Sequence, residues 1–437
     1  MFTLARYIIV DDDAAELKQL SDSLQGIGAP CLPLHYNEVE GINCDHLQGV
    51  RLLFLDLHLT TGAQSSDTAY ASGVIVDLLE RGISSATGPY VIILWTKHQE
   101  QKEAFEAYVM KNLDSSKRPI AILSLDKNEY LAGNAGGKLT ADVSRIIETD
   151  PRLRALLDWE REVLRAAGAT LVEIGTLVAA DDRIATRFSE RLDEILSLIA
   201  SEAVGEENAE ADPYSAINAA LMPILSDRIA NQRIHPTSNA IWKAAVTKIA
   251  GVPQPSLAEA AKLNSMLHLA ASGSEELKAG NWGAVTLLPE EGLEGLISGR
   301  FGVPVKPLLS GTFCISESVD RKASKLCVLR VGASCDYAQS RKGPIPFILG
   351  AIVPADAARR EKGLPKAEIV TPPMIVEGFE KPIVIVFNTF FQITLVPADF
   401  EEWKPLCRLR EPLLMQIATH GAQTATRPAI ISFKPQT

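Results

Sequence analysis

Short apolar runs alternate with amphipathic stretches over residues 1–150. The runs are almost continuously apolar and rich in branched side chains, which is typical of strands buried on both faces. They lie at 6–10, 51–57, 90–96 and 119–125, with a weaker run at 31–34. Between them, residues 14–28, 72–82 and 99–113 carry apolar side chains at helical spacing. This alternation predicts an α/β domain with a doubly wound parallel sheet and helices on both faces.

Residues 151–300 change to long runs of good helix formers and predict a helical region. One helical face between residues 185 and 204 is apolar, and it consists of Phe188, Leu192, Ile195, Leu196 and Ile199. Such a stripe is expected either in the core of a bundle or in a homodimer seam. We favour the core, because the apolar positions do not form strict heptads.

Residues 301–437 change again, to short apolar runs broken by Pro and Gly. Strands are predicted at 325–333, 347–355, 381–396 and 427–433, with a helix at 407–422. This β-rich region is expected to be a small barrel or sandwich. The 437 residues exceed one ordinary core, and we therefore predict three domains at 1–150, 151–300 and 301–437.

Composition limits the function classes. A hydrophobic content of 46% with 22% charged residues is that of a soluble globular protein. The net charge of −11 argues against general nucleic-acid binding, and no apolar run approaches the roughly 20 residues of a membrane helix. The N-terminus lacks the pattern of a signal peptide, and the six scattered cysteines contain no CxxC pair. We expect a cytoplasmic protein.

Polar residues stand where the predicted parallel strands end. Asp11 and Asp12 follow the first strand, and the later strands end at Asp56, Thr96 and Lys127. The carboxyl ends of parallel strands meet at one edge of a sheet, so these side chains are expected to converge. Carboxylates suit Mg²⁺, and a carboxylate beside it can accept a phosphoryl group whose charge a lysine and a hydroxyl neutralise.

The stretches "YIIVDDDAAEL", "RLLFLDLHL", "YVIILWT" and "AILSLDK" resemble the receiver domain of bacterial response regulators. The resemblance covers the N-terminal third and implies a flavodoxin-like fold. It implies that Asp56 is the phospho-acceptor, that Asp11 and Asp12 hold Mg²⁺ together with Asp56, and that Thr96 and Lys127 contact the phosphoryl group. It further implies a prokaryotic phosphorelay in which a histidine kinase or another phosphodonor is the partner.

Three positions depart from the receiver pattern. Thr60 and Asn128 stand where the family has proline, and Ser124 stands where an aromatic switch residue is common. The loop after Asp56 is also longer. These departures leave the acidic residues in place but question the usual relay of the phosphorylation signal. They favour an alternative, a phosphorylation-independent adaptor in a multiprotein prokaryotic assembly such as a defence system.

Simpler interpretations exist for some polar residues near the site. Asp13 is expected to cap the following helix, because a side-chain oxygen at that position accepts backbone N–H groups. His58 and His98 flank the site, and a lone loop histidine is more often solvated than catalytic.

The C-terminal region offers Cys335, Asp336 and Gln339 as candidate site residues. An enzymatic role would need a base near the Cys335 thiol, and His420 is the only histidine in the region. We favour a structural turn with a buried cysteine. Our hypotheses, in order, are a regulator controlled by the receiver-like domain, an adaptor, and an enzyme with its active site in the C-terminal domain; the first two are not enzymes beyond self-phosphorylation.

Overall fold

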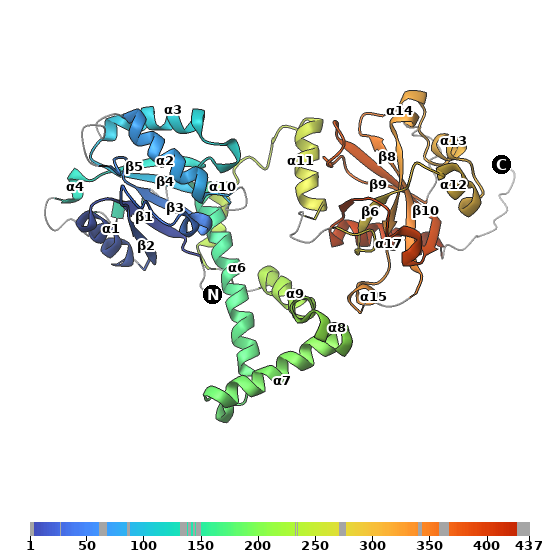
Figure 1. Cartoon of the computed structure of the whole chain (residues 1–437), viewed down its shortest axis with the longest axis horizontal. Coiled ribbons are helices and arrows are strands. Elements are labelled where there is room, and N and C mark those ends of the chain that lie inside the picture. Colours follow the sequence, from blue (N-terminus) through green and yellow to red (C-terminus); the bar gives the residue numbers. More distant parts are fainter. Residues whose placement is uncertain are drawn as a thin grey trace, which may run out of the picture. The chain divides into compact units, whose positions relative to one another are not determined.

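The computed structural model describes residues 4–26, 28–60, 68–84, 88–131, 138, 141–142, 145, 150–231, 233, 235–270, 277–339, 343–357 and 367–425. The chain divides into two compact units (Figure 1). The N-terminal unit contains residues 1–160 and 235–247, and the C-terminal unit contains residues 161–234 and 248–437.

The N-terminal unit is built on a five-stranded parallel sheet. Its strands are β1 (Tyr7–Asp11), β2 (Cys31–His35), β3 (Leu52–Leu55), β4 (Val91–Thr96) and β5 (Ala121–Asp126), in the order β2-β1-β3-β4-β5. Every pair is parallel. This order is the one found in flavodoxin-like sheets. The α/β fold predicted from the alternation of apolar runs is therefore confirmed, and all five strands lie at their predicted places.

Helices cover both faces of this sheet because the strands alternate their side chains between two cores. They are α1 (Ala14–Gly26), α2 (Thr68–Gly82), α3 (Lys102–Asn112), the short α4 (Asn128–Leu131), the start of α6 (Pro151–Thr176) and α10 (Ser238–Ala245). Ile9 packs with residues of α1 and α6, whereas Ile8 and Val10 pack with residues of α2 and α3. Short 3₁₀ turns lie at Cys44–Gly49, Gln99–Gln101 and Ser115–Lys117.

The predicted helical region is confirmed. It contains most of α6, followed by a 3₁₀ turn (Ala180–Asp182), α7 (Ala185–Val204), α8 (Glu206–Ala211), α9 (Pro213–Asn231) and α11 (Leu257–His268). Helix α7 packs along α9, and the five residues of its apolar stripe are half-buried. This packing supports an intramolecular role for the stripe. No helix in the described ranges is both long and apolar enough to cross a membrane.

The C-terminal unit contains a six-stranded antiparallel sheet. Its strands are β6 (Ala284–Leu287), β7 (Lys325–Arg330), β8 (Ile345–Pro354), β9 (Glu368–Val370), β10 (Ile383–Leu395) and β11 (Pro405–Arg408), in the order β11-β6-β7-β8-β10-β9. The β-rich character is as predicted, whereas the barrel form stays a prediction. Strand β6 was missed, and Cys407 and Arg408 belong to β11 although they were predicted to be helical. The strand predicted at 427–433 lies outside the described residues.

Helices and turns border this second sheet. They are α12 (Leu293–Phe301), α13 (Val305–Pro307), a π turn (Leu308–Thr312), α14 (Ser318–Ala323), α15 (Ser334–Ala338), α16 (Pro397–Phe400) and α17 (Glu411–Ala425). At the centre of the sheet Gly350 lies opposite Phe387. A Cβ at Gly350 would come within 2.7 Å of the Phe387 ring, so glycine leaves the space that the ring fills.

Candidate functional site: an acidic cluster around Lys127

The strand register brings the predicted residues to one edge of the parallel sheet. Asp11 ends β1, Thr96 ends β4, and Asp56 and Lys127 directly follow β3 and β5. The Asp56 N–H donates to the Val10 carbonyl oxygen at 3.0 Å, and the Lys127 N–H donates to the Thr96 carbonyl oxygen at 3.0 Å. These two bonds extend the pairing by one residue, and they fix where the Asp56 and Lys127 side chains begin.

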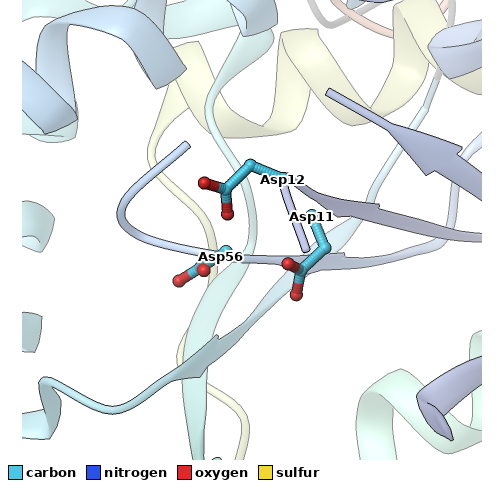
Figure 2. A group of neighbouring side chains, drawn as sticks. All are labelled: Asp11, Asp12 and Asp56. Carbon is cyan, nitrogen blue, oxygen red and sulfur yellow. The ribbon is translucent and has the colours of Figure 1, made fainter. Parts of the chain in front are cut away.

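Three carboxylates meet at this edge (Figure 2). One oxygen from each of Asp11, Asp12 and Asp56 lies within 4.8 Å of the others. Asp11 is fully buried, Asp56 retains 9% exposure, and Asp12 is half-buried. The donors are all hard oxygens, and those of Asp12 and Asp56 belong to side chains with partial access to solvent. Mg²⁺, which keeps several of its waters, prefers this kind of donor set, so the residues fit the metal that the sequence suggested.

Lys127 is enclosed by acidic groups. Its side chain is 1% exposed, and its Nζ lies 2.8 Å from Asp11 Oδ2 and 2.7 Å from Asp56 Oδ2. A third carboxylate, Glu16 Oε2, lies 2.7 Å away. The ammonium group thus uses all three of its N–H donors on carboxylate oxygens. The sequence-based expectation that Lys127 and the two aspartates converge agrees with this geometry.

Glu16 belongs to the cluster and was missed in the sequence. It lies in the first turn of α1 and contacts Lys127 through one oxygen and Lys97 Nζ through the other, at 2.6 Å. The spacing Asp13-x-x-Glu16 is that of a helix cap followed by an acidic residue, so a capping role was the simpler interpretation. Glu16 lies about one helical turn after Asp11–Asp13, and this proximity in sequence is the one feature that could have suggested a place for Glu16 at the same edge of the sheet.

Burial and pairing act in opposite directions on these groups. Burial raises the pKa of Asp56 and of Asp11, and the attraction of Lys127 only partly offsets that effect. Burial and then the charge of Asp11 raise the pKa of Asp12. For Lys127, burial favours loss of the proton, but Asp56 and Asp11 outweigh it and the pKa is raised. The cluster contains four carboxylates, those of Asp11, Asp12, Glu16 and Asp56, and two ammonium groups, those of Lys97 and Lys127. Its formal charge is therefore two negative, which a cation could balance.

The remaining residues around the cluster are held in place locally. Thr96 is fully buried, and its Oγ1 accepts the His98 N–H at 3.1 Å. The rings of His58 and His98 meet edge to face with centroids 4.7 Å apart, and His58 Nε2 lies 3.0 Å from Gln101 Oε1. Both histidines thus have protein contacts, although the His98 side chain remains 49% exposed.

The predicted helix cap is confirmed at Asp13. Its Oδ1 accepts the backbone N–H groups of Ala15 at 2.8 Å and Glu16 at 3.1 Å. These two hydrogen bonds lower the pKa of Asp13. Asp13 therefore stabilises the start of α1 and is separate from the three carboxylates that face one another.

The C-terminal candidates are arranged differently. Asp336 lies in α15, and the carbonyl oxygen of Gln339 accepts a hydrogen bond from Asn208 Nδ2 at 2.9 Å. Cys335 also lies in α15, but its side chain falls outside the described part of the structure. His420 lies on α17, where its carbonyl oxygen accepts a hydrogen bond from Thr424 Oγ1 at 2.8 Å. The hydrogen bond at Gln339 involves only its backbone, and the described contacts do not assemble the suggested catalytic set.

Comparisons with known proteins identify no relative. No family model matches the chain, and neither a curated protein nor a solved structure is detectably similar to it. The functional argument therefore rests on the sequence pattern and on the geometry of the acidic cluster.

Proposed function

We propose that the N-terminal unit is a receiver-like domain whose Asp56 accepts a phosphoryl group in a Mg²⁺-dependent reaction. The observation that supports this most strongly is the ion cluster in which Lys127 contacts both Asp11 and Asp56 beside a third carboxylate, Asp12. The chain would then be a cytoplasmic, prokaryotic phosphorelay regulator, in which a histidine kinase or another phosphodonor acts on the receiver-like unit and the helical and β-rich parts produce the output.

The proposed reaction uses the carboxylate and ammonium groups of this cluster, and Lys127 exchanges a carboxylate contact for the phosphoryl oxygens. An Asp56 carboxylate oxygen attacks the phosphorus of an acyl phosphate or phosphohistidine donor, and the bond from phosphorus to the donor's oxygen or nitrogen breaks with its electron pair. Lys127 neutralises charge on the phosphoryl oxygens. A Mg²⁺ ion held by Asp11, Asp12 and Asp56 would supply further charge neutralisation there. Asp56 retains 9% exposure at this edge of the sheet.

The metal site is tested by Asp12→Asn. Lys127 forms its ion pairs with Asp11, Asp56 and Glu16 and not with Asp12, so loss of the Asp12 charge leaves the buried ion pairs intact. We expect Mg²⁺ to raise the melting temperature of the wild-type protein and to have little effect on the variant. Burial raises the pKa of all three carboxyl groups above the ordinary 3.8, so protons compete with the metal and the Mg²⁺ effect should shrink as pH falls.

The matched control for the metal site is Asp13→Asn. Asparagine caps a helix about as well as aspartate, so this variant should respond to Mg²⁺ as the wild type does. A Mg²⁺ response that is equal in Asp12→Asn and in the wild type would remove Asp12 from the proposed metal site.

Phosphorylation is tested on the intact chain with acetyl phosphate and Mg²⁺. We expect a mass gain of one phosphoryl group in the wild type and in Asp13→Asn, and none in Asp56→Asn. Omission of Mg²⁺ should lower the yield strongly. If the wild type gains no phosphoryl group, or Asp56→Asn gains one, Asp56 is not the acceptor.

The structure also contains an observation that favours the adaptor alternative. Lys127 has three carboxylate partners, so its ion pairs link β1, β3 and α1 independently of phosphorylation. A receiver-like fold stabilised in this way could serve as a surface for a partner protein in a larger prokaryotic assembly, such as a defence system. Full activity of Asp56→Ala in the cell would support this alternative over phosphorylation control.

A further inference from the structure

Lys127 uses all of its N–H donors before any phosphoryl group is present. Its ammonium contacts Asp11, Asp56 and Glu16, with Nζ within 2.8 Å of one oxygen of each. A phosphoryl group on Asp56 brings anionic oxygens to the same ammonium, and such oxygens accept charge-assisted hydrogen bonds as carboxylates do. One of the three carboxylate contacts of Lys127 must therefore be given up when the phosphoryl group arrives.

Two of these contacts are fixed by other roles. Asp56 is the proposed acceptor, so it stays beside Lys127 once it carries the phosphoryl group. Asp11 is fully buried at the end of β1, and its Oδ1 accepts the Asp13 N–H at 2.8 Å. It is also one of the proposed Mg²⁺ ligands. Asp11 and Asp56 are therefore expected to keep their places.

Glu16 is the contact that can be exchanged. Its side chain extends from the first turn of α1, and its Oε1 lies 2.6 Å from Lys97 Nζ while its Oε2 lies 2.7 Å from Lys127 Nζ. Burial favours the neutral form of Glu16, but hydrogen bonds from Lys127 and Lys97 outweigh burial and lower the pKa of Glu16. The charged carboxylate therefore has a second cation, the half-exposed Lys97, to hold it when it leaves Lys127.

We propose that Glu16 is a built-in competitor for Lys127, whose carboxylate holds the N–H that a phosphoryl oxygen takes when Asp56 is phosphorylated. Lys97 keeps the displaced carboxylate. This inference rests on the proposed function of Asp56 and gives Glu16 and Lys97 positioning roles, since both act through Lys127. Glu16 slows phosphoryl transfer, and Lys97 lessens that effect because it attracts Glu16 away from Lys127. Phosphorylation then removes the link from α1 to the end of β5.

The two positioning residues should change the rate of phosphorylation in opposite directions. Glu16→Gln keeps the size of the side chain but removes the competing charge, so the full chain should take up a phosphoryl group at least about fivefold faster. Lys97→Met leaves the Glu16 carboxylate to Lys127, so uptake should be at least about fivefold slower. The measurement is the mass of the intact chain over time with acetyl phosphate. Mg²⁺ is kept saturating, because Glu16→Gln also makes the cluster less negative.

Comparison with stability separates this role from a purely structural one. Both single variants lose the Lys97–Glu16 ion pair, so neither should melt at a higher temperature than the wild type. A rate that followed stability alone would change in the same direction in both variants. The double variant, Glu16→Gln with Lys97→Met, should react within about twofold of Glu16→Gln, because Lys97 acts through Glu16. If Lys97 instead attracted the anionic donor, the double variant would be slower than Glu16→Gln by the full factor seen for Lys97→Met.

Asp13→Asn is the matched control for the loss of a negative charge. Asp13 lies three residues before Glu16, is exposed, and caps α1, so its charge is screened by water. We expect its rate to stay within about twofold of the wild type, because exposed charges interact weakly. A rate increase equal to that of Glu16→Gln would show that net charge, and not the contact with Lys127, governs the reaction.

The outcomes distinguish this inference from the proposed function. If the wild type is phosphorylated and Glu16→Gln is no faster, or Lys97→Met is no slower, Glu16 is not a competitor for Lys127 and Asp56 remains the acceptor. Uptake by Glu16→Gln but not by the wild type would support both statements. If neither protein takes up a phosphoryl group, the acceptor role of Asp56 fails, and the role of Glu16 fails with it.

Discussion

Lys127→Met is expected to destabilise the N-terminal unit by about 3–5 kcal/mol, because it leaves buried carboxylates without their compensating charge. The Lys127 ammonium contacts Asp11, Asp56 and Glu16, and both Lys127 and Asp11 are almost completely buried. Removing one partner of a buried ion pair costs far more than the pair itself contributes. Urea unfolding, with hydrogen exchange of β1, β3 and β4 as the local readout, measures this loss.

Lys97→Met is the matched control for this substitution. Lys97 contacts the same Glu16, but its side chain is 47% exposed, so water screens the charge and the expected loss is about 1 kcal/mol or less. Equal losses in the two variants would show that burial of Lys127 does not dominate the energetics of the cluster.

The pH dependence of the Lys127→Met penalty follows from the same contacts. The pKa of Lys127 is raised above the ordinary 10.5, so in the wild type its contribution is complete below that value and is lost only as pH rises through the raised pKa. In the variant, Asp11 and Asp56 lack their cation, and protonation removes their buried charge. The penalty should therefore shrink as pH is lowered from neutral toward 5, and a penalty that grew instead would contradict this account.

Phe387→Ala is expected to destabilise the C-terminal unit by about 3–5 kcal/mol, since it removes a fully buried ring from the centre of the antiparallel sheet. The ring lies over Gly350, which has no side chain, so nothing on the neighbouring strand can fill the space. Hydrogen exchange should quicken in β8 and β10 and stay unchanged in β1, β3 and β4.

Phe390→Ala is the control for Phe387→Ala. Phe390 is on the same strand but 66% exposed, and its truncation should change the free energy of unfolding by about 0.5 kcal/mol or less. If Phe387→Ala were as mild as this control, the packing of the ring against Gly350 would not be a main support of the sheet.

The central strands β1, β3 and β4 were predictable because they are continuous apolar runs, as expected of strands buried on both faces. The edge strand β2 is a weaker run and is only partly buried. The C-terminal sheet was less predictable. Strand β6 has only four residues, Ala284–Leu287, and it follows a long helical region, so its pairing with β7 depends on contacts distant in sequence. Cys407 and Arg408 precede a strong helical pattern and were assigned to it, but pairing with β6 keeps them extended.

At the acidic cluster, Asp11, Asp56 and Lys127 were predictable because each stands at the end of an apolar run. Glu16 was not, because a helix position does not reveal which way its side chain faces across a domain.

The chain passes through the N-terminal unit twice, since residues 235–247 return to it after the helical region. A gene fragment that stops at residue 150 would lack Leu153, which packs on the sheet, and Glu160, which pairs with Arg6 and Arg51. It would also lack the returning helix α10. A phosphotransfer assay on such a fragment would therefore test a less stable protein than the full chain. Limited proteolysis between residues 161 and 234 should lower the stability of the N-terminal unit, while its two parts stay associated.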